Sequence, residues 1–120
     1  MSYPLTGVKV LDLSRVLAGP FAGRMLSDLG ADVVKLEPPE GDVTRHWGVK
    51  RSGISGYYHQ QNAGKRNIAV DLRHPKGLMI TKSLVEQTDV LIENFRPDVM
   101  QRLGLDYDTL AEINPRLIML

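Results

Sequence analysis

The chain has 120 residues, of which 42% are hydrophobic and 24% are charged, as in an ordinary globular domain. Fifteen Lys and Arg residues nearly balance fourteen Asp and Glu residues, so the net charge of +1 predicts no general attraction to nucleic acid or to anionic lipid. The absence of cysteine excludes disulfides, thiolate metal sites and cysteine nucleophiles. No apolar run approaches the roughly 20 residues of a membrane span. We therefore expect a soluble, cytoplasmic protein that binds neither nucleic acid nor a membrane.

Five short apolar runs predict β-strands, because each is rich in β-branched or large aliphatic residues. In chain order they are residues 8–13, 31–36, 67–72, 89–93 and 116–120. Helical patterns occupy residues 20–30, 75–87, 97–104 and 106–114. Pro20, Pro75 and Pro97 each suit the first position of a helix, and Gly30 and Gly104 suit the position after a helix ends.

The first predicted helix is amphipathic, since Phe21, Met25, Leu26 and Leu29 fall on one face at helical spacing. Residues 38–66 form a long connection that we expect to be irregular apart from a short helix around residues 57–62. Connections of this length in compact domains usually bind something.

Strands that alternate with helices predict an α/β fold, with a mostly parallel sheet covered by helices on both faces. In such sheets, ligands bind outside the carboxyl ends of the strands. The stretches at those ends are residues 14–19, 37–42, 71–74 and 93–97. The last apolar run stops at residue 120 without a turn or cap, so we expect the chain to be the front part of a longer protein.

The first strand, turn and helix resemble a dinucleotide-binding unit whose second strand ends on Glu37, where a ribose-binding acid would lie. Gly19 and Gly23 do not have the spacing of the glycines in that motif, and their alternative role is close packing of the helix on the sheet. The histidines share no metal-ligand spacing, so we expect no metal site and interpret them as solvated loop residues: His46, His59 and His74.

Three arginines follow predicted strand ends or lie soon after them: Arg73, Arg96 and Arg102. A guanidinium group suits phosphate because its planar fork donates two hydrogen bonds at once. Beside them, Phe95 offers a face on which an adenine could stack, and Asn94 can both donate to a base and accept from it. This combination favours a nucleotide site at the edge of the sheet.

Three long motifs carry a resemblance to a known family: "PLTGVKVLDLSRVLAGPFAGRMLSDLGADVVKLEPPEGDVTR", "NAGKRNIAVDLRHPKG" and "DVLIENFRPDVMQRLGLDYDTLAEINPRLI". In this order they resemble the N-terminal part of the family III coenzyme A (CoA) transferases of the CaiB/BaiF type. That group includes formyl-CoA and carnitine-CoA transferases and the α-methylacyl-CoA racemases. The resemblance implies that residues 1–120 form the N-terminal part of a large Rossmann-like CoA-binding domain, and that the rest of that domain and a small domain lie outside this chain.

The resemblance also implies an interlocked homodimer at full length and transfer of CoA from an acyl-CoA thioester to a carboxylic acid, with CoA as co-substrate. In the family an aspartate carboxylate attacks the thioester, and an aspartyl-CoA intermediate follows. That aspartate would lie beyond Leu120, so no catalytic residue is expected in this chain, and the chain alone is expected to be inactive. Two alternatives stay open: an α-methylacyl-CoA racemase, and a non-catalytic nucleotide- or CoA-binding module.

The CoA-binding residues that the resemblance implies fall in four groups: Leu17 and Ala18; Val70, Asp71, Leu72 and Arg73; Asn94, Phe95 and Arg96; and Arg102. Two positions depart from some members. Formyl-CoA transferases have glutamine at the position of Leu17, which argues against the formate and oxalate pair. Some members have a CoA-binding arginine at the position of Pro38, so the phosphate contacts here must differ.

Overall fold

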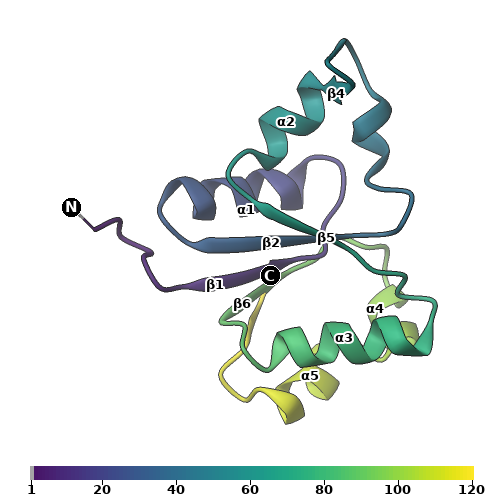
Figure 1. Cartoon of the computed structure of the whole chain (residues 1–120). Coiled ribbons are helices and arrows are strands. Elements are labelled where there is room, and N and C mark those ends of the chain that lie inside the picture. Colours follow the sequence, from purple (N-terminus) through teal and green to yellow (C-terminus); the bar gives the residue numbers. More distant parts are fainter. Residues whose placement is uncertain (1) are drawn as a thin grey trace.

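The computed structural model describes residues 2–120 and has an α/β fold built on a five-stranded sheet (Figure 1). The strands are β1 (Lys9–Asp12), β2 (Asp32–Glu37), β5 (Arg66–Ala69), β6 (Val90–Ile92) and β7 (Ile118–Met119). Their order is β5-β2-β1-β6-β7, and every neighbouring pair is parallel. All five predicted strands are confirmed, with small shifts at their ends. Because the order reverses between β1 and β6, a binding crevice is expected at the carboxyl ends of these two strands.

Helices cover both faces of the sheet, as predicted (Figure 1). One face carries α1 (Ala18–Asp28) and α2 (Gly56–Asn62). The other carries α3 (Pro75–Val85), α4 (Val99–Leu103) and α5 (Tyr107–Ile113). Within residues 2–120, no helix combines the length and the apolar character that crossing a membrane would require.

The connection between β2 and β5 is more ordered than expected. The predicted short helix is confirmed as α2, but the rest is not irregular, because it contains a 3-10 helix (Val43–His46) and an antiparallel hairpin of β3 (Lys50–Arg51) and β4 (Ile54–Ser55). Two side chains cap its helices: Asp42 accepts from the backbone N–H of Thr44, and Ser55 accepts from that of Tyr58. The rings of Trp47 and Tyr57 also pack together, with centroids 5.4 Å apart.

The central strands bury apolar side chains against both helical layers, as parallel strands between two such layers do. Along β1, Val10 faces a cluster with Val33 and Ile92, against which Leu26 of α1 packs. The next residue, Leu11, faces the larger cluster under α3, α4 and α5. That cluster consists of Leu11, Leu13, Leu36, Val70, Val85, Leu91, Met100, Leu105, Leu110 and Leu117.

The apolar face predicted for α1 contributes only one of its four residues to the core. Phe21 and Met25 are each 51% exposed and Leu29 is 44% exposed, so only Leu26 packs on the core. The apolar spacing identified one face of the helix correctly, but that face is not the one that the sheet receives.

Small residues bring α1 onto the sheet instead: its buried residues are Gly19, Pro20 and Gly23. A Cβ on Gly23 would lie 2.7 Å from Oδ2 of Asp12, and one on Gly19 would lie 2.1 Å from Cβ of Ser14. Close packing therefore explains both glycines, as the alternative to a dinucleotide motif predicted.

Two predicted helix starts are also wrong. Pro75 is the first residue of α3, as expected, but Pro20 is the third residue of α1, and Pro97 lies outside α4. The residue that precedes α4 is Asp98, which has a left-handed backbone with φ of 67°. Asp tolerates this conformation better than most residues. Gly104 ends α4 as predicted, with φ of 65°.

Gly77 is the place where α3 touches the turn after β5. A Cβ on Gly77 would lie 2.0 Å from the backbone oxygen of Asp71. We expect Gly77→Ala to lower the free energy of unfolding by about 1–3 kcal/mol, the scale of overpacking, measured by urea unfolding with circular dichroism. The matched control is Gly56→Ala in α2, where the nearest atom is the backbone oxygen of Val49 at 3.7 Å. Equal stability of the two variants would contradict this account.

Candidate functional site

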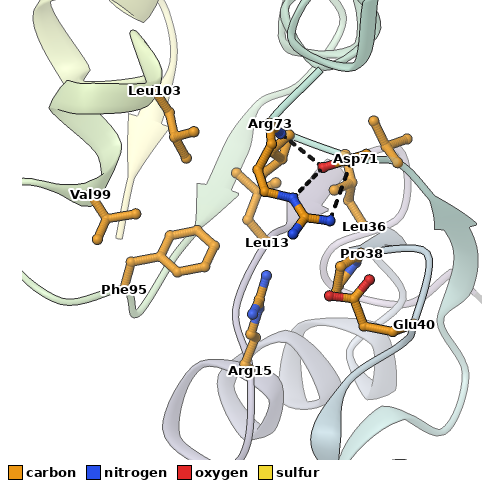
Figure 2. A pocket seen from close by; sticks show the side chains of 12 residues that line it. Leu13, Arg15, Leu36, Pro38, Glu40, Asp71, Arg73, Phe95, Val99 and Leu103 are labelled. Atoms are coloured by element: carbon orange, nitrogen blue, oxygen red, sulfur yellow. Dashed lines mark hydrogen bonds and ion pairs between the residues drawn. The ribbon is translucent and has the colours of Figure 1, made fainter. Parts of the chain in front are cut away.

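A pocket of about 280 Å³ lies at the carboxyl ends of β1, β2, β5 and β6 (Figure 2). Its walls come from segments far apart in the sequence, which the parallel sheet brings to one edge. The lining residues are Leu13, Arg15, Leu36, Pro38, Glu40, Val70, Asp71, Leu72, Arg73, Phe95, Val99 and Leu103. The pocket therefore occupies the position at which open parallel sheets bind ligands.

The turn after β5 carries an exposed ion pair that lines the pocket (Figure 2). Oδ1 of Asp71 accepts from both the backbone N–H and Nε of Arg73, each at 2.9 Å. These hydrogen bonds from Arg73, together with its charge, hold the pKa of Asp71 below its ordinary value. The pair fixes the shape of the turn and leaves further guanidinium N–H groups of Arg73 for a ligand.

A second contact joins the segment after β1 to the segment after β6. The side chain of Asn94 bonds the backbone of Arg15 in both directions: Arg15 N donates to Oδ1 at 2.8 Å, and Nδ2 donates to Arg15 O at 2.7 Å. The guanidinium of Arg15 lies over the ring of Phe95, with Cζ 5.3 Å from the ring centroid. This distance is within the range of a cation–π contact.

Residues 14–16 form a turn whose backbone is held by side chains from other elements. Lys35 donates to Ser14 O at 2.8 Å, and Val16 N donates to Oδ2 of Asp42 at 3.2 Å. Val16 has φ of 71°, which is a strained conformation for a β-branched residue. The surrounding hydrogen bonds are what keep this turn in place, and α1 begins at Ala18, after Leu17.

Buried ion pairs supply several of these contacts. Lys35 lies 3.2 Å from Asp42, and Lys65 lies 2.7 Å from Asp12, with all four side chains almost completely buried. Burial by itself would raise the pKa of Asp42, but hydrogen bonds from Thr44 and the charge of Lys35 outweigh it and hold the pKa below its ordinary value. Asp42 thus stays ionised beside the turn.

Lys65 ties α1 and α2 to the first strand. Its Nζ donates to Oδ2 of Asp12 and to Pro20 O, both at 2.7 Å, and to Oδ1 of Asn62 at 2.9 Å. Burial lowers the pKa of Lys65, and Asp12 opposes that shift. The three acceptors satisfy a charge that would otherwise be costly to bury.

Glu37, the candidate ribose-binding acid, is engaged by the protein itself. It is 2% exposed, and its carboxylate accepts two hydrogen bonds from Arg45, at 2.6 and 2.7 Å. It also accepts from Asp42 N at 2.7 Å and from the side chains of Tyr58 and Asn67. No oxygen of this carboxylate is left facing a ligand, so the structure argues against a dinucleotide bound in the ordinary way.

The expected CoA-binding residues fall into two groups in the structure. Five of them line the pocket: Val70, Asp71, Leu72, Arg73 and Phe95. The other five do not line it: Leu17 and Ala18 at the start of α1, Asn94 on the backbone of Arg15, and the exposed Arg96 and Arg102. The histidines are exposed as expected, but the loop assignment is wrong for His46, which ends the 3-10 helix, and for His59, which lies in α2. His74 caps α3 by accepting from Lys76 N.

Arg15 is the main pocket residue that sequence analysis missed. It lies within residues 14–19, one of the stretches assigned to a strand end, but nothing in its neighbours marks it as a site residue. Its place depends on Asn94, which is 79 positions away. The other unassigned lining residues are Leu13, Leu36, Pro38, Glu40, Val99 and Leu103.

Acid should weaken the fold through Glu37. Burial opposes its ionisation, but the hydrogen bonds from Arg45, Tyr58 and Asp42 outweigh burial and lower its pKa from 4.5 to about 2. A lowered folded-state pKa contributes stability above the unfolded value, and this stability is lost as the pH falls from 4.5 towards 2. The shift corresponds to on the order of 3 kcal/mol.

We therefore expect Glu37→Gln to be less stable at pH 7 and to lose less further stability between pH 4.5 and pH 2, measured by urea unfolding at each pH. Glu112→Gln, on the exposed surface of α5, is the matched control and should follow the unmodified protein. Parallel pH profiles for the Glu37→Gln variant and the unmodified protein would contradict the assignment.

Comparison with known proteins places the chain in a family. Residues 5–120 match the model of CoA-transferase family III. The chain is 49% identical over 123 residues to succinate–glutarate CoA-transferase of Agrobacterium fabrum, covering 96% of the chain and 31% of that protein. It is 50% identical over 117 residues to succinyl-CoA:glutarate CoA-transferase of Homo sapiens, covering 96% of the chain and 27% of that protein.

A solved structure agrees. The crystal structure of a CaiB/BaiF family protein from Brucella suis superposes with a TM-score of 0.93 at 47% identity, covering 99% of this chain and 33% of that one. The chain thus spans between 27% and 33% of the length of these proteins. With a family match over almost every residue, a common fold and nearly half the residues shared with each relative, the chain belongs to CoA-transferase family III.

Proposed function

We propose that the full-length protein carrying this sequence is a CoA transferase that moves CoA from an acyl-CoA thioester to a carboxylic acid. The observation that carries the proposal is the family match over residues 5–120. The pocket at the carboxyl ends of the strands supports it, because five of the residues expected to bind CoA line that pocket. In this proposal the chain is the N-terminal part of a large CoA-binding domain within a cytoplasmic, interlocked homodimer.

The pocket has the chemistry that a nucleotide requires. Apolar walls and the ring of Phe95 offer a surface for a base, and Arg73 offers guanidinium donors for phosphate. Leu17 and Ala18 begin the adjoining helix and would lie beside the thioester, while Arg96 and Arg102 would contact the coenzyme from its exposed side. The pocket therefore serves to bind and orient CoA rather than to perform the chemistry.

The chemistry would proceed through an aspartate beyond residue 120. A carboxylate oxygen of that residue attacks the thioester carbonyl and the C–S bond breaks. CoA leaves as the thiolate, and the acyl group and the aspartate form a mixed anhydride. The thiolate then attacks the aspartyl carbonyl and releases the donor acid, which gives an aspartyl-CoA thioester. The acceptor carboxylate attacks this thioester in turn, and the returning thiolate forms the new acyl-CoA and frees the aspartate.

Dicarboxylic acids are the substrates to examine first. The relatives from Agrobacterium fabrum and Homo sapiens carry succinate or succinyl-CoA and glutarate in their names, at 49% and 50% identity. Leu17, where formyl-CoA transferases have glutamine, argues against the formate and oxalate pair. We therefore propose succinyl-CoA as donor and glutarate as acceptor.

The covalent intermediate gives a direct test. The full-length protein is mixed with succinyl-CoA and treated with hydroxylamine or borohydride, and its peptides are examined by mass spectrometry. We expect one aspartate beyond residue 120 to become a hydroxamate or an alcohol, and we expect CoA to pass to glutarate. Protein treated without succinyl-CoA is the control.

Two other outcomes would favour the alternatives. Deuterium exchange at the α carbon of a branched acyl-CoA, without any acceptor acid, would indicate the racemase. Binding of CoA with neither exchange nor modification would indicate a non-catalytic binding module.

Phe95 should contribute stacking to CoA binding. Phe95→Leu keeps an apolar side chain but removes the aromatic face, and we expect it to weaken CoA binding by about 1–3 kcal/mol.

Arg102→Ala should weaken CoA binding by a similar amount, because a hydrogen bond to a charged group is lost. Calorimetry on the full-length protein measures both, and Tyr107→Leu on exposed α5 is the control. Unchanged affinity in both variants, with the fold intact, would remove these residues from the site.

A further inference from the structure

Arg15 and Arg73 are the two arginines that line the pocket, and their charges are offset to different extents. Arg73 pairs with Asp71 at 2.9 Å; this hydrogen bond, then the charge of Asp71 and then that of Glu40 raise the pKa of Arg73. Among residues 2–120, Arg15 forms no ion pair with any carboxylate. Arg15 is therefore the pocket cation whose charge remains available to an anionic ligand.

Arg15 is held both at its backbone and at its guanidinium group. Its backbone N–H and C=O are both bonded by Asn94, at 2.8 and 2.7 Å. Its guanidinium is supported by the ring of Phe95 and points into the space between Phe95 and Pro38 (Figure 2). A side chain that is already oriented loses less conformational entropy when a ligand binds.

We propose that Arg15 binds a phosphate of CoA and that Asn94 is the positioning residue that holds Arg15 in place. This inference rests on the proposed function. It gives Asn94 a positioning role in place of the direct contact with CoA that the sequence led us to expect. Phosphate is the fitting anion because the guanidinium fork matches its geometry, and because the apolar wall and aromatic ring beside Arg15 suit the base of the same ligand.

The side-chain amide of Asn94 already bonds the backbone of Arg15. Its side-chain oxygen accepts from Arg15 N and its side-chain nitrogen donates to Arg15 O, so both ends of the amide are engaged. Removing Asn94 would free the turn that carries Arg15 instead of deleting a contact to the ligand. The effect of Asn94 on binding should therefore disappear once Arg15 is absent.

The first experiment measures CoA affinity by calorimetry on the full-length protein and its Arg15→Gln variant. Loss of a charge-assisted hydrogen bond should weaken binding about 10- to 100-fold. The matched control is Arg66→Gln, which removes an exposed arginine paired with Asp32 across β5 and β2, away from the pocket. The control should bind CoA as the unmodified protein does.

Comparison with 3′-dephospho-CoA shows which phosphate is involved. If the Arg15→Gln loss persists with this ligand, the contact is to the diphosphate; if it disappears, the contact is to the 3′-phosphate. Either result supports the proposal. An unchanged CoA affinity, or an increase only in the KM for glutarate, would overturn it. Failure of the unmodified protein to bind any CoA would count against the proposed function instead.

A double-mutant cycle tests the role of Asn94. Asn94→Ala alone should weaken CoA binding, but in the Arg15→Gln background it should change affinity by less than about 2-fold, since the two residues act as one unit. A purely structural role or a direct contact with the ligand would give equal losses in both backgrounds and would overturn the positioning role. Thermal unfolding of each variant confirms that the fold is retained.

Discussion

The turn at residues 14–16 depends on hydrogen bonds that reach it from outside its own segment. Asn94 after β6, Lys35 on β2 and Asp42 after β2 each bond its backbone. Without them, the left-handed Val16 would relax, because a β-branched residue gains nothing from that conformation by itself. The start of α1 and the position of Arg15 both follow from this turn, so the geometry of the pocket depends on buried polar contacts as well as on apolar packing.

The parallel sheet makes those contacts available. Because β2 and β6 lie on either side of β1, the segments after both strands reach the segment after β1. Burial of Lys35 and Asp42 in an apolar interior would be costly for either alone, and the ion pair reduces that cost. The sheet order brings these segments together, and the buried ion pair then holds the strained turn beside the pocket.

Much of the fold follows from sequence, because strand and helix patterns are local. All five strands of the sheet and the α2 helix were predicted, whereas the hairpin of β3 and β4 was not, since each strand has only two residues. The apolar face of α1 was predicted, but its direction was not, because Phe21, Met25 and Leu29 have helical spacing whether or not they pack on the sheet. Glycines that permit a close approach carry no such periodic signal.

Part of the site could also be predicted, because some of its residues are marked by local sequence pattern. Residues 70–73 and Phe95 could be placed at the pocket because they follow strands directly, and ligands bind at the ends of parallel strands. Arg15 follows a strand too, but its orientation depends on Asn94 and Phe95, both distant in sequence. Long-range pairing of this kind cannot be deduced from local pattern.

The carboxylate of Glu37 stabilises the pocket wall that Pro38 and Glu40 form. Pro38 and Glu40 lie in the short arch between Glu37 and Asp42, and Glu37 bonds the backbone of Asp42 at 2.7 Å, so the arch is closed at its base. A second bond, from Gly41 N to Pro38 O at 2.8 Å, crosses it. The width of the pocket on this side is therefore set before a ligand arrives, and a ligand that fits need not spend binding free energy on folding that wall.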